Sequence, residues 1–245
     1  MNDEKIEEKK IPPGWGQDSL SEFIENAWHN TFATFHNVKD WYSILKDIHL
    51  VFDAITHNID RTPDWFASFF LFRSHSAYLG SVRLALSGQT PETYIVLRGC
   101  LENALYGFYV SRNAESREIW LRRHDDEKSN KAVRKTFTIR NLLKALRSED
   151  LKLHDVAQEL YDRTIDLGGH PNEQAVFTVM KQTVNGTKLT FESGYLVGNE
   201  PALVLALKTC AQIGTCALSV FQRIYRERFD ILGLSDQLAS LKRGL

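Results

Sequence analysis

Two opposite charges lie one helical turn apart in an otherwise apolar stretch of this chain. Arg98 and Glu102 interrupt the segment TYIVLRGCLENALYGFYV, and their spacing places both side chains on one face of a helix. Charges are rarely buried in such a setting unless they are paired, because an unpaired ion is costly to remove from water. We therefore expect either an internal ion pair that fixes the helix or a polar pocket that binds a ligand through Arg98 and Glu102. Arg73 and His75 point to different sides of the preceding segment, so at most one of them joins Arg98.

A second pair, Arg163 and His170, stands near the expected end of a helix in the sequence YDRTIDLGGHPN. An arginine followed seven residues later by a histidine, in a helical protein with a long central helix pair, resembles the pattern of the HEPN superfamily. That resemblance implies metal-independent RNA cleavage in a groove between two subunits. Arg163 would stabilise the phosphate, and His170 would assist attack of the ribose hydroxyl by general acid–base catalysis. The two glycines between them also fit a structural turn in which His170 caps or binds backbone.

Other catalytic patterns are missing from the sequence. The adjacent His124 and Asp125 are similar to the centre of HD-type metal phosphohydrolases, but the remaining histidines have no companion spacing. The chain has no Glu-x-x-His pair, no His-Glu-x-x-His, no Gly-rich phosphate loop and no G-x-S-x-G turn. We therefore expect neither a metal nor a cofactor.

The overall charge does not favour a polyanionic partner. The 245 residues contain 30 Lys and Arg against 31 Asp and Glu, for a net charge of -1. No global field draws such a chain to nucleic acid or anionic lipid. The segment 130–147 is basic, which is typical of a solvated helix face and also leaves local contact with RNA open.

The three cysteines and the apolar stretches indicate a reducing, aqueous compartment. Cys100, Cys210 and Cys216 fall in apolar segments without a CxxC or zinc spacing, as buried free thiols do. The N-terminal segment is polar where a signal peptide needs an apolar core. Charges interrupt every long apolar stretch, so we expect no membrane span and a cytoplasmic location.

Helix signals follow one another along most of the chain. Residues 1–17 are predicted to form a flexible tail, and a single helical domain is predicted over 18–245. Thr62-Pro63-Asp64 and Thr90-Pro91-Glu92 each place a capping hydroxyl before a proline and an acid, which is a strong start signal. The two helices that follow are apolar around most of their circumference, and their short connection predicts a central antiparallel pair.

The remaining segments are expected to cover this central pair. Residues 115–128, 130–147 and 150–167 each combine an apolar stripe with a charged face, and a long apolar helix is predicted from about 200 to 229. Asn185-Gly186 between β-branched residues predicts a small hairpin at 181–192. The predicted fold is therefore all-α, a bundle of about eight helices around the central pair, with one small hairpin.

Two classes of function fit these patterns. The first is a non-catalytic binding or interaction module, assembled as a homo-oligomer, with a small ligand at Arg98 and Glu102 or a partner on an apolar helical face. The second is a HEPN-like ribonuclease that uses Arg163 and His170. Whether the chain is an enzyme depends on which of the two is correct.

Overall fold

A computed structural model describes residues 11–169, 180–185, 188–198 and 200–245. Most of the predicted tail and the predicted catalytic residue His170 lie outside the described residues. The all-α class is confirmed. The described part contains eleven α-helices, against about eight predicted, and one π-helical turn, Ile165–Gly169.

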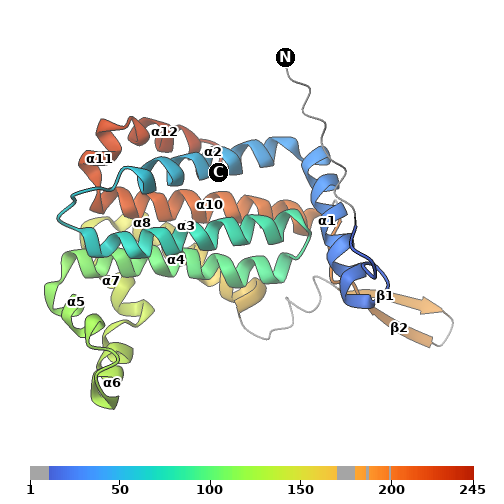
Figure 1. Ribbon diagram of the computed structural model, residues 1–245, viewed down its shortest axis with the longest axis horizontal. Coiled ribbons are helices and arrows are strands. Elements are labelled where there is room, and N and C mark those ends of the chain that lie inside the picture. The colour runs from blue at the N-terminus through green and yellow to red at the C-terminus, as the bar shows by residue number, and fades with distance from the viewer. Residues whose placement is uncertain (1–10, 170–179, 186–187, 199) are drawn as a thin grey trace.

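Four long helices form the body of the molecule: α2 (Lys39–His57), α3 (Trp65–Leu86), α4 (Thr90–Arg112) and α10 (Pro201–Ile224). They run alongside one another, with α3 and α4 antiparallel and in contact over most of their length, and α10 packs on α2, α3 and α4 (Figure 1). The core lies between these helices, and α1 (Ser19–Asn37) crosses one end of them.

The covering helices are shorter than the sequence predicts, because capping side chains interrupt them. The segments predicted as three helices form α5 (Ala114–Leu121), α6 (Glu127–Thr136), α7 (Ile139–Glu149) and α8 (Leu151–Thr164). Asp126 accepts a hydrogen bond from the Ser129 amide at 2.6 Å, and Thr138 accepts one from Asn141 at 3.3 Å. Each cap satisfies amides at a new helix start, which is why the polar segments break there.

Two further short helices complete the chain. Tyr225 ends α10, and α11 (Arg226–Ile231) and α12 (Leu234–Leu241) follow, with α12 packed on α2 and α10. Before α10, the strands β1 (Met180–Asn185) and β2 (Lys188–Ser193) pair antiparallel, with Met180 opposite Ser193.

The helix α10 is the one described helix that is long and apolar enough to cross a membrane, and 78% of its apolar window is buried within this fold. It carries the buried Cys210 and Cys216, while Cys100 is buried on α4. Burial raises the pKa of Cys100 and of Cys216 to about 12, so both stay protonated thiols at neutral pH. The cytoplasmic location stays a prediction.

A pair of histidines joins α2 to α3 in the half-buried layer next to the core. His49 Nδ1 and His75 Nε2 share a hydrogen bond of 2.9 Å, and the Phe52 ring stacks on His75 with centroids 5.1 Å apart. Burial and the neighbouring His49 and His57 together lower the pKa of His75 to about 4, against the opposing effect of Asp53. His75 therefore favours its neutral imidazole at neutral pH.

The histidine pair predicts a loss of stability in mild acid. A histidine in the unfolded chain takes up its proton near pH 6.5, whereas folded His75 does so only near pH 4. The unfolded state therefore binds more protons in this window, and the unfolding free energy falls as the pH drops from about 6.5 to about 4. Allowing for solvent screening, His75 contributes on the order of 1 kcal/mol of this loss.

Urea unfolding at pH 7.5 and pH 5.0 measures the effect against a variant that cannot titrate. His75→Gln keeps a hydrogen-bonding side chain, and the difference between its two unfolding free energies should be smaller than in the unmodified chain. Equal differences in both proteins would show that His75 does not cause the loss.

Candidate functional site

Arg98 and Glu102 contact each other on α4. Arg98 Nε lies 3.3 Å from Glu102 Oε1, and both side chains are one-third exposed. The Tyr161 hydroxyl of α8 donates to the same carboxylate oxygen at 3.4 Å. Burial raises the pKa of Glu102, and the attraction of Arg98 and the Tyr161 hydrogen bond lower it only in part. Of the two expectations for Arg98 and Glu102, the contact between them corresponds to the ion pair.

A cleft of about 650 Å³ lies beside Glu102, between α3, α4 and α5. Its walls are aromatic, and its polar side chains are Glu102, Asn103, Arg73 and Arg123. The Arg123 guanidinium lies 4.8 Å from the centre of the Trp120 ring. Of the predicted pair, only Glu102 lines this cleft. Arg73 joins it, whereas the neighbouring His75 is engaged with His49.

Arg163 is held by two side chains. It donates to Glu159 at 2.7 Å and to Gln212 of α10 at 2.5 Å. The adjacent shallow cleft of about 480 Å³ is lined by three acids, Glu159, Asp162 and Asp166, and by two cations, Arg163 and Lys208. Its described rim therefore carries more negative than positive side chains. His170 lies outside the described residues, so the structure does not place it relative to Arg163.

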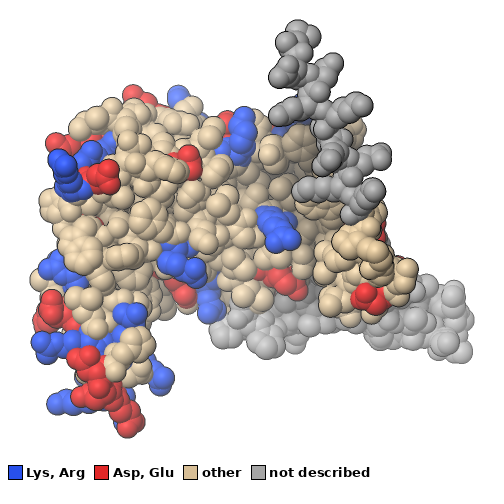
Figure 2. All heavy atoms as spheres, viewed as in Figure 1, with Lys and Arg blue, Asp and Glu red and all other residues tan. Residues whose placement is uncertain are grey.

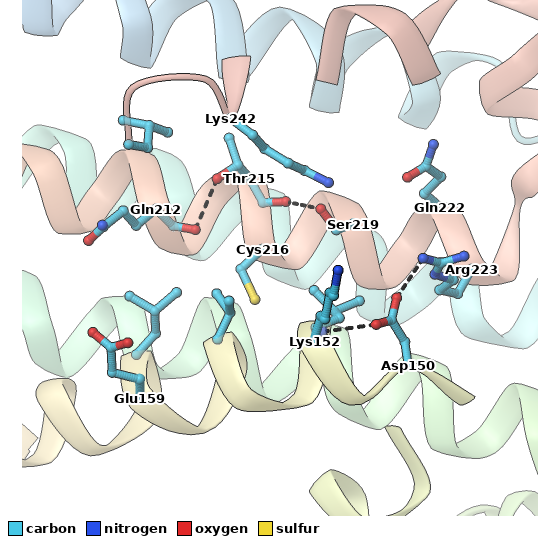
Figure 3. A pocket seen from close by; sticks show the side chains of 14 residues that line it. Asp150, Lys152, Glu159, Gln212, Thr215, Cys216, Ser219, Gln222, Arg223 and Lys242 are labelled. Atoms are coloured by element: carbon cyan, nitrogen blue, oxygen red, sulfur yellow. Dashed lines mark hydrogen bonds and ion pairs between the residues drawn. The ribbon is translucent and has the colours of Figure 1, made fainter. Parts of the chain in front are cut away.

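A third cavity lies between α8, α10 and the C-terminal end of α12, and sequence analysis did not identify it. It measures about 440 Å³, within the usual range for small-molecule sites. Figure 3 shows α8 forming one wall and α10 the other, with Lys242 reaching in from the segment after α12. The apolar part of its surface comes from α8, α10 and the chain end: Leu153, Val156, Leu160, Cys216 and Leu245.

The α10 wall carries a polar stripe. Gln212, Thr215, Ser219 and Gln222 recur every three or four residues, which places them along one side of the helix. The Thr215 and Ser219 hydroxyls donate to carbonyls of their own helix at 2.9 and 2.6 Å. Gln212 accepts from Arg163 through Oε1, so its amide nitrogen remains the donor of that side chain.

Two lysines reach into this cavity from opposite sides. In Figure 3 the Lys152 amino group points from α8 toward α10, and the Lys242 side chain extends from the other side across the α10 wall. Asp150 pairs with Arg223 at 2.5 Å, and Glu159 pairs with Arg163. Within the described part of the chain, neither lysine has an acid within ion-pair distance. The cavity therefore presents two ammonium groups that form no ion pair with a carboxylate of the described residues.

Burial shifts the pKa values of two groups that line this cavity, Lys242 and Cys216. It lowers the pKa of Lys242, and Arg223 lowers it further, while Cys216 and Asp150 raise it in part. The Cys216 thiol is almost fully buried, and its raised pKa keeps it protonated, so it offers apolar surface instead of a nucleophile. The site combines charge and apolar area, which suits binding better than covalent chemistry.

One sequence signal does point to this cavity. A polar stripe at 212, 215, 219 and 222 interrupts the long apolar helix α10, and such a stripe is unusual on a helix face that packs in an apolar core. The lysines give no such signal, because they are 90 positions apart and each is a common surface residue. Only the packing of α8 and the chain end on α10 brings them together.

In the residues that the structure describes, no three His, Cys, Asp or Glu side chains converge in a way that could hold a metal ion. No family model, curated protein or solved structure matches this chain.

Proposed function

We propose that this chain is a non-catalytic binding module and that the cavity between α8, α10 and α12 takes a small organic anion. The observation that carries this proposal is the pair of ammonium groups, Lys152 and Lys242, at one cavity, with no carboxylate of the described residues within ion-pair distance of either. An anionic head group between them would gain charge-assisted hydrogen bonds. The Gln212 amide nitrogen is a further donor at the same wall.

The apolar residues of the cavity indicate the chemistry of the uncharged part of the ligand. Leu153, Val156 and Leu160 of α8, with Cys216 of α10, provide an apolar surface next to the charged groups. An alkyl chain on this surface would leave water, which favours binding. Carboxylates and phosphate monoesters share the required chemistry, a compact anion on a short apolar body.

Isothermal titration calorimetry with three matched probes tests the proposal. Hexanoate and hexyl phosphate carry the two anionic heads, and hexanol carries the same chain without a charge. We expect at least one anion to bind and hexanol to bind at least tenfold more weakly. Inorganic phosphate as a fourth probe shows whether the chain contributes. If neither organic anion binds at millimolar concentration, the proposal is wrong.

Variants locate the binding. Lys242→Gln and Lys152→Gln should each weaken binding of the anion about tenfold or more, which corresponds to about 1.4 kcal/mol. Lys144→Gln removes the same charge from α7, outside the cavity, and should leave the affinity unchanged. Val156→Trp fills the cavity without removing a charge and should also abolish binding.

The affinity for the anion should fall as alkaline pH deprotonates Lys242. Because the pKa of Lys242 is lowered, this fall should begin at a lower pH than for an ordinary lysine.

The HEPN-like ribonuclease remains the alternative, and the same protein preparations test it. Arg163 would have to exchange Glu159 and Gln212 for a phosphate. Cleavage of RNA in the presence of chelator, lost in His170→Ala, would replace the binding proposal with this one. Absence of cleavage in both proteins would leave the anion-binding module as the better account.

A further inference from the structure

One side of α3 exposes large apolar side chains to solvent. Trp65, Phe69, Phe72 and Leu79 recur at intervals of four, three and seven residues, so they share one side of the helix. Trp65 is 57% exposed and Phe69 54% exposed, and Ile95 of the neighbouring α4 is 53% exposed. We call these five residues the aromatic face. In Figure 2, charged side chains are sparse over the middle of the view, where α3 and α4 run in Figure 1.

The aromatic face is large enough for a stable interface. Each of its five side chains exposes about half of the roughly 200 Å² available to it, so together they present on the order of 500 Å² of apolar surface. A standard interface buries about 800 Å² on each partner, of which somewhat more than half is apolar. The face therefore supplies the apolar area that one side of such an interface needs.

The charges beside the face indicate what covers it. The charged side chains of α3 are Arg73 and Arg83, without an acid, while α4 carries the exposed acid Glu92 and the half-buried Glu102, which pairs with Arg98 of its own helix. Both pairs are ten residues apart, about 15 Å along a helix. Because α3 and α4 are antiparallel neighbours joined by a short turn, Glu92 lies at the level of Arg83 and Glu102 at the level of Arg73.

Because the two arginines and the two acids have the same spacing, the charges of two copies can pair with each other. A two-fold axis along the helix pair lays α3 of one copy over α4 of the other, so that Arg83 comes opposite the partner's Glu92 and Arg73 opposite the partner's Glu102. An isologous interface repeats each contact twice. We propose that the aromatic face binds a second copy of this chain, α3 against α4, in a symmetric dimer. This proposal is independent of ligand binding in the cavity of α8 and α10.

Sedimentation velocity of the full chain at about 50 µM tests the dimer. Phe72→Glu places a charge in the middle of the aromatic face and should give a monomer with an unchanged circular dichroism spectrum. Leu151→Glu changes another exposed apolar residue, on α8, which lies behind α3 and α4 in Figure 1, and should leave the dimer intact. A monomeric unmodified chain, or a dimer that survives Phe72→Glu, overturns the proposal.

Charge reversal tests the arrangement itself. Arg83→Glu and Glu92→Arg each place like charges opposite one another and should raise the dissociation constant at least tenfold. The double variant restores opposite charges at both contacts, so its dissociation constant should return to within about threefold of the unmodified value. If the two single effects instead add in the double variant, these residues do not face each other across the interface and the α3–α4 pairing is wrong.

Discussion

Replacement of Gly214 by alanine is expected to lower the free energy of unfolding by about 2 to 4 kcal/mol. Gly214 lies in α10 at its crossing with α2 and α3. A Cβ atom there would stand 2.6 Å from Tyr78 Cε2 and 2.8 Å from Ile48 Cγ2, closer than real Cβ contacts. Both neighbours are fully buried, so neither can move into solvent.

The hydrogen bond of Tyr78 makes this contact rigid. Its hydroxyl donates to the Leu45 carbonyl of α2 at 2.9 Å, and a ring displaced by the new methyl group would lose that bond. A buried carbonyl left without its donor costs about 1 to 3 kcal/mol. The gain in helix propensity from glycine to alanine, about 1 kcal/mol, offsets only part of these costs.

Urea unfolding measures the effect, with Gly80→Ala as the matched control. Gly80 is also inside a helix, but its Cβ would meet only Val96 Cγ1 at 3.6 Å, an ordinary contact. Alanine there should be neutral or should stabilise the chain by up to about 1 kcal/mol. Equal unfolding free energies for the two variants would contradict the close packing at the α10 crossing.

Much of the helical framework was readable from local signals in the sequence. Asp18 accepts from the amides of Leu20 and Ser21 at 2.9 Å, as a capping residue before α1 should. α4 begins at Thr90, at the predicted place, but Gln89 is the residue before the helix and the Thr90 hydroxyl does not cap it as predicted. The contact of Arg98 with Glu102 follows from their spacing alone, because side chains four residues apart meet on a helix.

Features that depend on tertiary packing could not be read in this way. The cleft beside Glu102 requires α5 to bring Trp120 and Arg123 against α3, and no local pattern specifies that approach. From the sequence, we did not predict that helices begin after Asp126 and Thr138. The apolar stripe of these polar segments is weak, so a single capping side chain decides where each helix begins. The cavity of α8 and α10 joins residues that only the folded chain brings together.

Gly88→Ala is the second substitution expected to have a large effect, about 3 kcal/mol or more of lost stability. Gly88 forms the turn between α3 and α4 with φ of 85°, a left-handed conformation that alanine adopts at a cost of about 1 to 2 kcal/mol. A Cβ atom there would also lie only 2.5 Å from Asn30 Nδ2 and even closer to the Val197 carbonyl oxygen.

This turn is where three distant segments meet. The Val197 amide donates to the Gly88 carbonyl at 2.8 Å, and Asn30 of α1 donates to the carbonyls of Ser87 and Val197 at 2.8 and 3.1 Å. Moving the turn to make room for a methyl group would break these bonds. The substitution should therefore loosen α1 and the segment before α10 together with the central pair.

Gly233→Ala separates the two causes of this loss. Gly233 also has a positive φ, 69°, but a Cβ there meets nothing within 4 Å, so this variant measures backbone strain alone. Its unfolding free energy should fall by about 1 kcal/mol, against about 3 kcal/mol for Gly88→Ala. Hydrogen exchange should then show faster exchange of the Val197 amide in Gly88→Ala only. Equal losses in the two variants would mean that the contacts of Asn30 and Val197 with this turn do not contribute to stability.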